Sequence, residues 1–381
     1  MTPSFILIGL ALFTWGIGEG MFMYFVPLYL EQLGANPITI GSIFSVFGFV
    51  MMITHIPAGY LADKIGRRPM IQAAWILGAI STWMMGLAPS LSLFVIGYVL
   101  YGVTGFVMAP LFSYVTAARG KLSAGRAMTL TSAMFNLGAV IGPVSGGWIG
   151  EHVNMRYIFV WSAFVFVFSS LVILFLRPQP RDEPDGENTG RKLFTNTRFL
   201  SFLGVIFFVM FATYLPQPLS PNFLQNERGI SLGQIGLLGS LGSLGNVAFN
   251  LVLGQLNARL GFVLGQFFVA LFALSLWKGN GQAWYMLGYF LMGGFRAARM
   301  LATAQVRVLI HQAQMGLAYG MAEVGNSLAL ILSPLVAGYL YDRDPASIYS
   351  LSLLLITIGI IISLIFAPRE KRQPMKETVR M

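Results

Sequence analysis

The segment Gly59 to Pro69, GYLADKIGRRP, puts one acidic and three basic side chains between two long apolar runs. These runs, residues 40–62 and 70–88, each have the length of a membrane-spanning helix, because a bilayer core about 30 Å thick needs roughly 20 apolar residues to cross it. Charged side chains that follow such a run are expected at the membrane surface. The segment therefore predicts a short loop that joins two transmembrane helices.

The same apolar pattern recurs along nearly the whole chain of 381 residues, of which 56% are hydrophobic and 10% are charged. Soluble domains carry about 25% charged residues, so this composition excludes a soluble protein and predicts an all-α membrane protein. We expect twelve transmembrane helices. They cover approximately residues 5–30, 40–62, 70–88, 91–118, 127–150, 156–176, 199–225, 232–256, 263–278, 283–308, 315–340 and 347–366.

The distribution of Lys and Arg predicts the orientation, because short loops rich in these residues stay on the cytoplasmic side. With the N-terminus inside, most of the 24 Lys and Arg residues lie on that side. Those in outer loops are Arg156, Arg228, Lys278 and Arg343. The sequence predicts a multi-pass protein of the cell membrane, the inner membrane in a bacterium, with both termini cytoplasmic. Its net charge of +10 indicates contact with anionic membrane lipids and gives no sign of nucleic-acid binding.

A polar stretch, RPQPRDEPDGENTGRK from Arg177, follows the sixth span. Its prolines, glycines and mixed charges are typical of a solvated linker. We therefore expect a six-helix bundle over residues 1–176, a cytoplasmic linker over 177–198, a second six-helix bundle over 199–366 and a basic cytoplasmic tail over 367–381.

The two halves also resemble each other in sequence. With an offset of 191 residues, Gly97, Tyr98, Gly102, Pro143 and Gly147 align with Gly288, Tyr289, Gly293, Pro334 and Gly338. With an offset of 195, Ile40, Gly41, Gly59, Leu61 and Gly66 align with Ile235, Gly236, Gly254, Leu256 and Gly261. Together these matches favour a duplication, which in membrane carriers places the substrate near the midplane between the halves.

The loop between the second and third spans resembles the signature of the major facilitator superfamily, and the likeness covers essentially the full chain. The matching residues are Gly59, Ala62, Asp63, Lys64, Gly66, Arg67 and Arg68. The resemblance implies a transporter fold of two pseudo-symmetric six-helix bundles that work by alternating access. It also implies that Asp63 and Arg67 stabilise the outward-facing state. The alternative is that these charges only anchor a cytoplasmic loop. The second half has Ala258 opposite Asp63 and Phe262 opposite Arg67, so only one half has the complete motif.

The fifth span contains GAVIGPVSGG, with Gly138, Gly142, Pro143, Gly146 and Gly147. It resembles the fifth-helix motif of the drug:proton antiporters of this superfamily. Glycines four residues apart allow close helix packing and the proline bends a helix, so ordinary membrane packing is the alternative. The fourth span departs from these antiporters, with Tyr98 at the position of a usual Arg and Tyr101 at that of a usual Gln.

The eighth span has a glycine at every third position: Gly233, Gly236, Gly239, Gly242 and Gly245. Three residues turn a helix by about 300°, so this row moves around the helix and does not mark a single face. We expect a slim helix that packs closely on several neighbours.

Charged residues inside the spans are the best candidates for function, because each costs several kcal/mol in the membrane unless it is paired or hydrated. Glu19 in the first span is the candidate for proton coupling, a role that first-helix acids have in several members of the family; the alternative is a hydrogen-bonded structural acid. In the tenth span Arg296 and Arg299 share one face. Arg299 could pair with Glu323, leaving Arg296 to meet Glu19 or an anionic substrate group.

Further polar and aromatic residues are candidates for the substrate site, together with Arg296, Arg299 and Glu323, because such side chains suit an amphipathic ligand. They are Trp15, Tyr24, Tyr101, Asn136, Gln217, Asn246, Asn250 and Gln305.

The sequence thus predicts a secondary active transporter, expected as a monomer, in which protons drive the efflux of a small amphipathic molecule. An alternative is a carrier of an anionic metabolite, sugar derivative or lipid, favoured by the missing Arg of span four and by the arginines of span ten. A membrane enzyme is a distant alternative, suggested only by Asp342 to Asp344 in a short loop. We expect no cofactor and no metal site.

Overall fold

The structure is a computed structural model that describes residues 2–178, 196–310 and 315–368. For residues 55–60, 62, 63, 109, 124, 125 and 315–317 it describes the backbone alone. Most of the expected linker and nearly all of the expected tail therefore lie outside the described residues.

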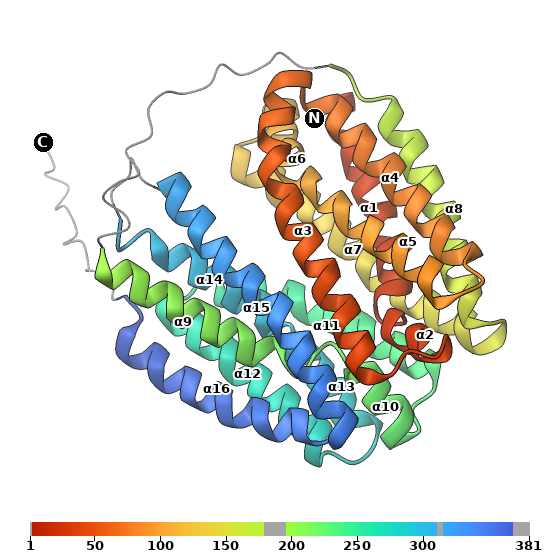
Figure 1. The fold of residues 1–381 in the computed structure, drawn as a ribbon. Helices are drawn as coiled ribbons and strands as arrows, with labels where there is room; N and C mark the ends of the chain where they lie inside the picture. Colours follow the sequence, from red (N-terminus) through yellow and green to blue (C-terminus); the bar gives the residue numbers. More distant parts are fainter. Residues whose placement is uncertain (1, 179–195, 311–314, 369–381) are drawn as a thin grey trace, which may run out of the picture.

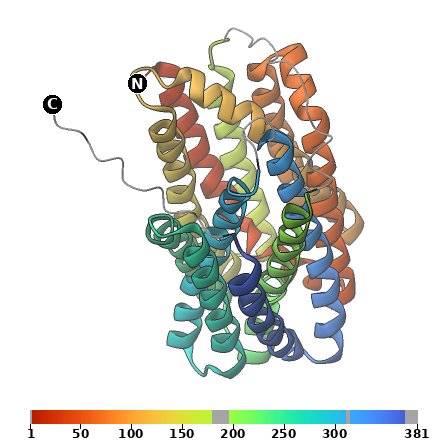
Figure 2. The same ribbon diagram turned by 90° about the vertical axis from the view of Figure 1, so that its left-hand side faces the viewer.

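Two groups of helices lie side by side (Figure 1). We call them the first and the second bundle. The first contains α1 (Pro3–Met23), α2 (Val26–Gln32), α3 (Pro37–Ile65), α4 (Arg67–Leu87), α5 (Leu91–Val103), the 3₁₀ helix η1 (Thr104–Val107), α6 (Met108–Ala118), α7 (Ala124–His152) and α8 (Met155–Leu174). The second contains α9 (Thr197–Tyr214), α10 (Ser220–Arg228), α11 (Leu232–Leu253), α12 (Ala258–Lys278), α13 (Gln282–Met292), α14 (Gly294–Val306), α15 (Met315–Arg343) and α16 (Ser347–Phe366). Figure 2 shows the same division, with the first bundle in red to yellow-green and the second in green to blue.

Several helices begin at residues that cap them. Thr2 precedes α1 and accepts from the Phe5 amide at 3.2 Å, and Ser123 precedes α7 and accepts from the Arg126 amide at 3.3 Å. Such side chains satisfy amides at the helix start that have no partner within the helix. Gly66 separates α3 from α4 with a φ of 96°, a backbone conformation that favours glycine. The segment from Gly59 to Pro69 therefore contains only a one-residue break, at Gly66, between two long helices.

Among the described residues, ten helices are long and apolar enough to cross a membrane by themselves, and α5 with α6 can form an eleventh span that is bent by 43°. The tenth expected span, residues 283–308, is formed by α13 and α14, which meet at Gly293. The described helices thus cover the residues of all twelve expected spans, up to eleven of which are long and apolar enough to cross a membrane. Besides α5 with α6 and α13 with α14, two further spans expected to be continuous are broken: the first into α1 and α2, and the seventh into α9 and α10. The second break coincides with Pro216 and Pro218, which lack the amide hydrogen that a helix interior needs.

The bundles contact each other mainly through two pairs of helices. In the first pair, α11 lies on α7 so closely that a Cβ added to Gly236 would collide with the carbonyl of Pro143 and approach Gly147. The hydroxyl of Ser240 donates to the carbonyl of Val140 at 2.5 Å. Glycine at this contact lets two backbones approach directly.

The second pair, α3 and α15, has the same arrangement. A Cβ added to Gly41 would collide with the carbonyl of Pro334 and approach Gly338. The hydroxyl of Ser45 donates to the carbonyl of Ile331. Every residue of this contact is related to one of the first by the offsets of 191 and 195 residues, so the repeat seen in the sequence is also a repeat of contacts. We call the two contacts the pivots.

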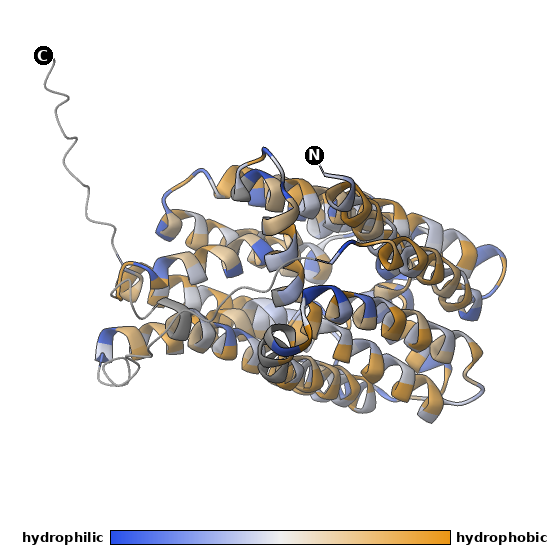
Figure 3. Cartoon of the chain, turned by 90° about the horizontal axis from the view of Figure 1, so that it is seen from above, coloured by the Kyte–Doolittle hydropathy of each residue, from blue (hydrophilic) through white to orange (hydrophobic). Residues whose placement is uncertain are grey.

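Both pivots lie at the end of the molecule opposite to the N-terminus. Gly41 is near the start of α3, which runs away from that end, and Gly147 is near the end of α7, which runs towards it. Figure 1 shows the bundles together there and diverging towards the side on which the chain begins. Figure 3 looks onto that side and shows hydrophobic helices with hydrophilic stretches near the middle of the view. We refer to the two ends as the pivot side and the N-terminal side.

Candidate functional site

Glu19 lies in the middle of the first span and is half-buried. Its Oε2 accepts a hydrogen bond from Nε1 of Trp15 at 2.9 Å and another from the hydroxyl of Tyr101 at 2.8 Å. In the described part of the chain, no group donates to Oε1. Two neutral donors thus fix the carboxylate without cancelling its charge, and one oxygen stays available to a proton or a cation.

An aromatic cluster of the first bundle positions Trp15. Its ring lies 4.7 Å from that of Trp75, 4.5 Å from that of Phe166 and 5.9 Å from that of Tyr101. On the far side of the indole, a Cβ added to Gly78 would collide with the ring. The tightly packed indole has little freedom to rotate, which keeps its N–H directed at Glu19. Thus three sequence candidates, Glu19, Trp15 and Tyr101, form one site.

The ion pair expected in the second bundle is confirmed. Arg299 Nη2 donates to Glu323 Oε1, and the Nδ2 of Asn326 donates to Glu323 Oε2 at 3.1 Å. The side chains of Arg299 and Glu323 are 29% and 50% exposed, although the pair lies within two spans. Charged groups at such depth face the interior of a bundle or a water-filled cavity and not lipid, so we expect this pair to face the space between the bundles.

Arg296 is exposed one helical turn before Arg299. It forms no hydrogen bond or ion pair with the residues that the structure describes, Glu19 included. Its guanidinium interacts electrostatically with the phenols of Tyr24 and Tyr214. Tyr24 belongs to the first bundle and Tyr214 to the second, so Arg296 faces the space between them.

The other polar candidates are less closely associated with these charges. Asn136 donates to the carbonyl of Ser132 in its own helix at 2.8 Å, and Gln217 donates to that of Thr213 at 2.7 Å. Gln305 is 1% exposed and donates to the carbonyls of Leu301 and Ala258, so it packs α14 onto α12 on the side away from Arg296.

The helix α11 is associated with three further candidates. Asn246 and Asn250 belong to it, and Tyr24, at the end of α1, lies against it. Tyr24 packs on Gly239 and Gly242 of that helix. Asn246 is half-buried and Asn250 is exposed. Gly233 contacts α7 and Gly245 contacts α13, so the glycine row of α11 does meet a succession of neighbours around the helix.

The fifth-helix motif serves packing on two sides of α7. Gly138, Gly142 and Gly146 leave no room for a Cβ against the backbone of α1, the helix that contains Glu19. Pro143 and Gly147 lie in a pivot, as described above. The motif thus connects the helix of the candidate proton carrier to the contact about which the bundles meet.

The superfamily motif from Gly59 to Arg68 can be placed only in part. Gly59 and Asp63 lie in α3, but the structure does not describe the side chain of Asp63. Arg67 and Arg68 begin α4 and are half-buried. The proposed role of Asp63 and Arg67 in stabilising the outward-facing state therefore stays a prediction.

Two carboxylates that sequence reasoning missed join the bundles on the pivot side. Glu31 of α2 accepts from the amide groups of Asn222 and Asn226 of α10. Its position is related to that of Asn222 by the offset of 191, which is the one sequence signal that could have revealed it.

The second is Glu151 at the end of α7. Its Oε2 accepts from the hydroxyl of Ser231 at 3.0 Å and from the amide of Gly233 at 2.6 Å. A carboxylate at the N-terminus of α11 also interacts favourably with the helix dipole. Both acids lie at helix ends, where the sequence alone does not distinguish them from surface charges.

Replacing Glu151 with Gln should weaken the contact on the pivot side. Gln keeps an acceptor oxygen but loses the negative charge at the start of α11, which is worth about 1 kcal/mol. We expect the amide exchange of the first turn of α11 to rise roughly fivefold, measured by hydrogen–deuterium exchange. The matched variant Glu227→Gln, at an exposed acid of α10, should leave it unchanged. Equal exchange in both variants would contradict the role of Glu151.

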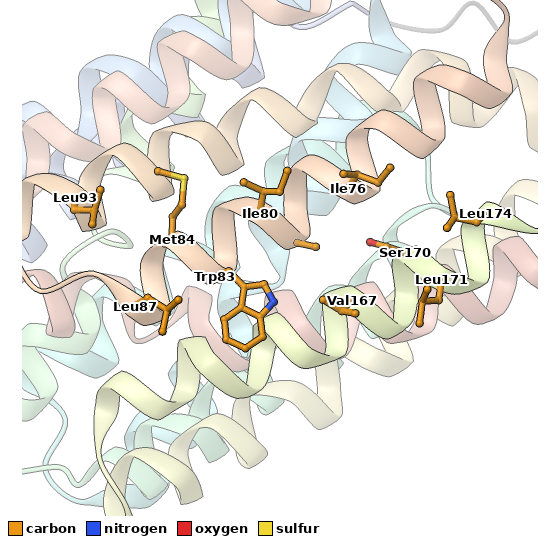
Figure 4. Close-up of a pocket in the computed structure, with 11 residues that line it drawn as sticks. Ile76, Ile80, Trp83, Met84, Leu87, Leu93, Val167, Ser170, Leu171 and Leu174 are labelled. Carbon is orange, nitrogen blue, oxygen red and sulfur yellow. The ribbon is translucent and has the colours of Figure 1, made fainter.

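A groove of about 590 Å³ lies outside this region, on the surface of the first bundle between α4, α5 and α8. Figure 4 shows its lining, which is apolar apart from Ser170. Ile76, Ile80 and Leu87 line it from the face of α4 opposite Gly78. Its lining has no charged group, so lipid chains suit it better than the substrate of a charged site.

Comparison with known proteins agrees with this geometry. The model of the Major Facilitator Superfamily matches residues 8–217 and 202–380. Multidrug resistance protein 1 of Bacillus subtilis is 23% identical over 91% of this chain and 92% of its own. Quinolone resistance protein NorA of Staphylococcus aureus is 21% identical over 95% of both chains. A crystal structure of a mutant of the nucleoside transporter NupG has a TM-score of 0.83 at 14% identity, covering 95% of this chain and 98% of that one. The chain therefore belongs to the Major Facilitator Superfamily, a family of membrane transporters, and has its fold.

Proposed function

We propose that this protein is a proton-coupled efflux transporter for small amphipathic molecules, with Glu19 as the group that binds protons. The observation that carries this proposal is the carboxylate of Glu19, which is fixed by Trp15 and Tyr101 and has one oxygen without a protein donor in the described residues. The names of the two sequence relatives support efflux of drugs.

The proposed cycle uses competition at Glu19. On the cytoplasmic side, where the proton concentration is lower, the carboxylate is ionised and attracts a cationic group of the substrate. On the outer side a proton binds Glu19 and releases that group. Substrate and proton thus occupy the site in turn, which couples proton entry to substrate exit.

The positive-inside distribution of Lys and Arg supports the N-terminal side as cytoplasmic. The structure then corresponds to an inward-facing state, with the pivots closing the outer side. The transmembrane aromatic cluster around Glu19 supports an amphipathic substrate, because aromatic faces bind both apolar rings and cations.

The test is transport by the purified protein in proteoliposomes. A cationic fluorescent amphiphile should accumulate in vesicles whose interior is acidic, and the proton ionophore nigericin with K⁺ on both sides should abolish the accumulation. Liposomes without protein give the background. Uptake that is indifferent to the pH gradient would contradict proton coupling, and no uptake under either condition would contradict transport of such molecules.

A further inference from the structure

We propose that the groove between α4, α5 and α8 binds an acyl chain of a membrane phospholipid, and that Arg156 binds the phosphate of the same lipid. The lipid belongs to the leaflet on the pivot side, and its headgroup is anionic. This inference concerns a second binding site, on the outer surface of the first bundle. It does not depend on what the protein transports or in which direction.

The shape of the groove matches a single hydrocarbon chain. Its lining along α4 extends from Ile76 to Leu87, which is about 16 Å at the rise of an α-helix and close to half of a bilayer core of about 30 Å. Leu93 of α5 and Leu171 of α8 line its sides. Figure 4 shows the lining residues spread along α4 and α8 and not gathered around a round cavity. The groove therefore has the length of one leaflet.

The side chains of the groove suit lipid in their chemistry as well. Ile76, Ile80 and Leu87 are large, apolar and exposed. On a helix that spans a membrane, such side chains are expected to meet hydrocarbon. Ser170 is polar, but its hydroxyl donates to the carbonyl of Phe166 in its own helix at 2.7 Å. The groove thus offers a ligand hydrocarbon contacts along its whole length.

Arg156 lies at the pivot-side end of the groove. Its Nε donates to the carbonyl of Gly86 at 2.8 Å, and Gly86 directly precedes Leu87 of the lining. The side chain is exposed, and its two terminal nitrogens form no hydrogen bond with the residues that the structure describes. The bond to Gly86 holds the guanidinium in place, so its open edge can bind a phosphate with two parallel hydrogen bonds.

The charge of Arg156 differs in its surroundings from the other basic residues of the pivot side. Each of those lies over an aromatic ring of its own. The pairs are Arg228 with Phe223, Lys278 with Trp277 and Arg343 with Tyr339. Within the described ranges, Arg156 has neither such a ring nor an ion pair. Glu151, the acid closest to it in sequence, accepts from Ser231 and Gly233 of α11. An anionic headgroup would supply the counter-charge.

Exposed aromatic side chains connect Arg156 with the groove. The ring of Trp83, in the lining, lies 4.9 Å from that of Phe164, which lies 5.8 Å from that of Trp161. Tyr157 lies one helical turn before Trp161 and directly follows Arg156, and both of these aromatic side chains are exposed. Trp and Tyr concentrate where a membrane meets water. We therefore expect Arg156 at the level of the phosphates and the groove at the level of the chains.

Quenching of Trp83 fluorescence by brominated lipid tests this inference in a bilayer. The protein is reconstituted in mixtures of phosphatidylglycerol and phosphatidylcholine in which one of the two carries bromine at the middle of its chains. The chain has seven Trp residues, so the signal of Trp83 is the difference between each protein and its Trp83→Phe counterpart. We expect phosphatidylglycerol to bind about fivefold more tightly than phosphatidylcholine, the effect of one basic residue on an anionic lipid.

Four variants assign the preference to the site. Arg156→Gln should abolish it, and Arg156→Lys should keep part of it, because Lys keeps the charge and loses the fork. The matched control Arg343→Gln removes an exposed charge from the same side of the molecule and should keep the full preference. Ala79→Leu enlarges a side chain of the lining while Arg156 stays intact, and it should lower the quenching of Trp83 because the chain no longer fits.

Equal binding of the two lipids by the wild-type protein would overturn the inference. So would a preference that survives Arg156→Gln, or one that Arg343→Gln removes to the same extent, because the charge would then act from elsewhere. Quenching of Trp83 that Ala79→Leu leaves unchanged would place the chain outside the groove and would overturn it as well.

Discussion

Replacing Glu19 with Gln should stop proton-driven transport while leaving the protein folded. Gln has the same length and keeps an oxygen that can accept from Trp15 Nε1 and from the Tyr101 hydroxyl, so the local packing persists. It cannot exchange a proton, however, and it has no charge with which to distinguish a cation from a neutral molecule. We therefore expect accumulation driven by a pH gradient to fall to the level of protein-free vesicles.

Exchange of labelled for unlabelled substrate across the membrane should persist in Glu19→Gln at high substrate concentration. This exchange needs the bundles to move but needs no proton, so it separates coupling from folding and from movement. Glu227→Gln, at an exposed acid on the pivot side, is the control and should transport as the wild-type protein does. Proton-driven accumulation by Glu19→Gln at the wild-type rate would place the proton site elsewhere.

Replacing Gly41 with Leu should open the pivot side. A side chain at Gly41 meets the backbone of α15, and backbone atoms cannot turn aside as a flexible side chain can. The two bundles must then separate at the contact between α3 and α15. Since the contact between α7 and α11 lies on the same side, it should open as well.

Labelling of an introduced cysteine measures this opening, and the natural chain has no cysteine to interfere. Ser240 is 4% exposed in the contact between α7 and α11. With Ser240→Cys as reporter, we expect Gly41→Leu to raise the rate of labelling by a membrane-impermeant maleimide by about tenfold or more, which equals a shift of about 1.4 kcal/mol. Gly204→Leu is the matched control, because a Cβ at Gly204 of α9 meets no atom within 4 Å. Equal labelling in both variants would contradict the pivots.

Much of this fold could be predicted from the sequence because the membrane imposes strong rules. Long apolar runs, charged loops and the motif from Gly59 to Pro69 predicted the spans and the family. The repeat offsets matched Pro143 with Pro334 and Gly41 with Gly236 before any contact was known, and these residues form the two pivots. Small residues at such contacts leave a readable pattern because only they permit close backbone approach.

Contacts between distant side chains could be predicted only where charge required a partner. Arg299 and Glu323 lie at similar depth on consecutive spans, and each needs the other, so their pairing was foreseeable. The bond from Tyr101 to Glu19 spans 82 residues and involves a neutral donor, which no rule of spacing identifies. Tyr101 was noted as a polar aromatic candidate and because it replaces a residue that is usual in the drug antiporters, and neither observation indicated Glu19 as its partner.

The short helices α2 and α10 on the pivot side could not be predicted from the sequence either. Apolar runs continue through the break near Tyr24, because α2 is buried and must be as apolar as a span. Glu31 and Glu151 look like ordinary charges at helix ends until their partners in the second bundle are known.

Competition between substrate and proton at Glu19 can be measured directly as proton release on binding. The purified protein is mixed with the cationic dye rhodamine 123 in weakly buffered solutions over a series of pH values from acidic to neutral, and the released protons are counted with a pH-indicating dye or electrode. The wild-type protein should release up to about one proton for each molecule bound, because a cation binds the ionised form of Glu19 more tightly than the protonated form. Glu19→Gln should release none. Binding without proton release by the wild-type protein, or equal release by both proteins, would contradict the account.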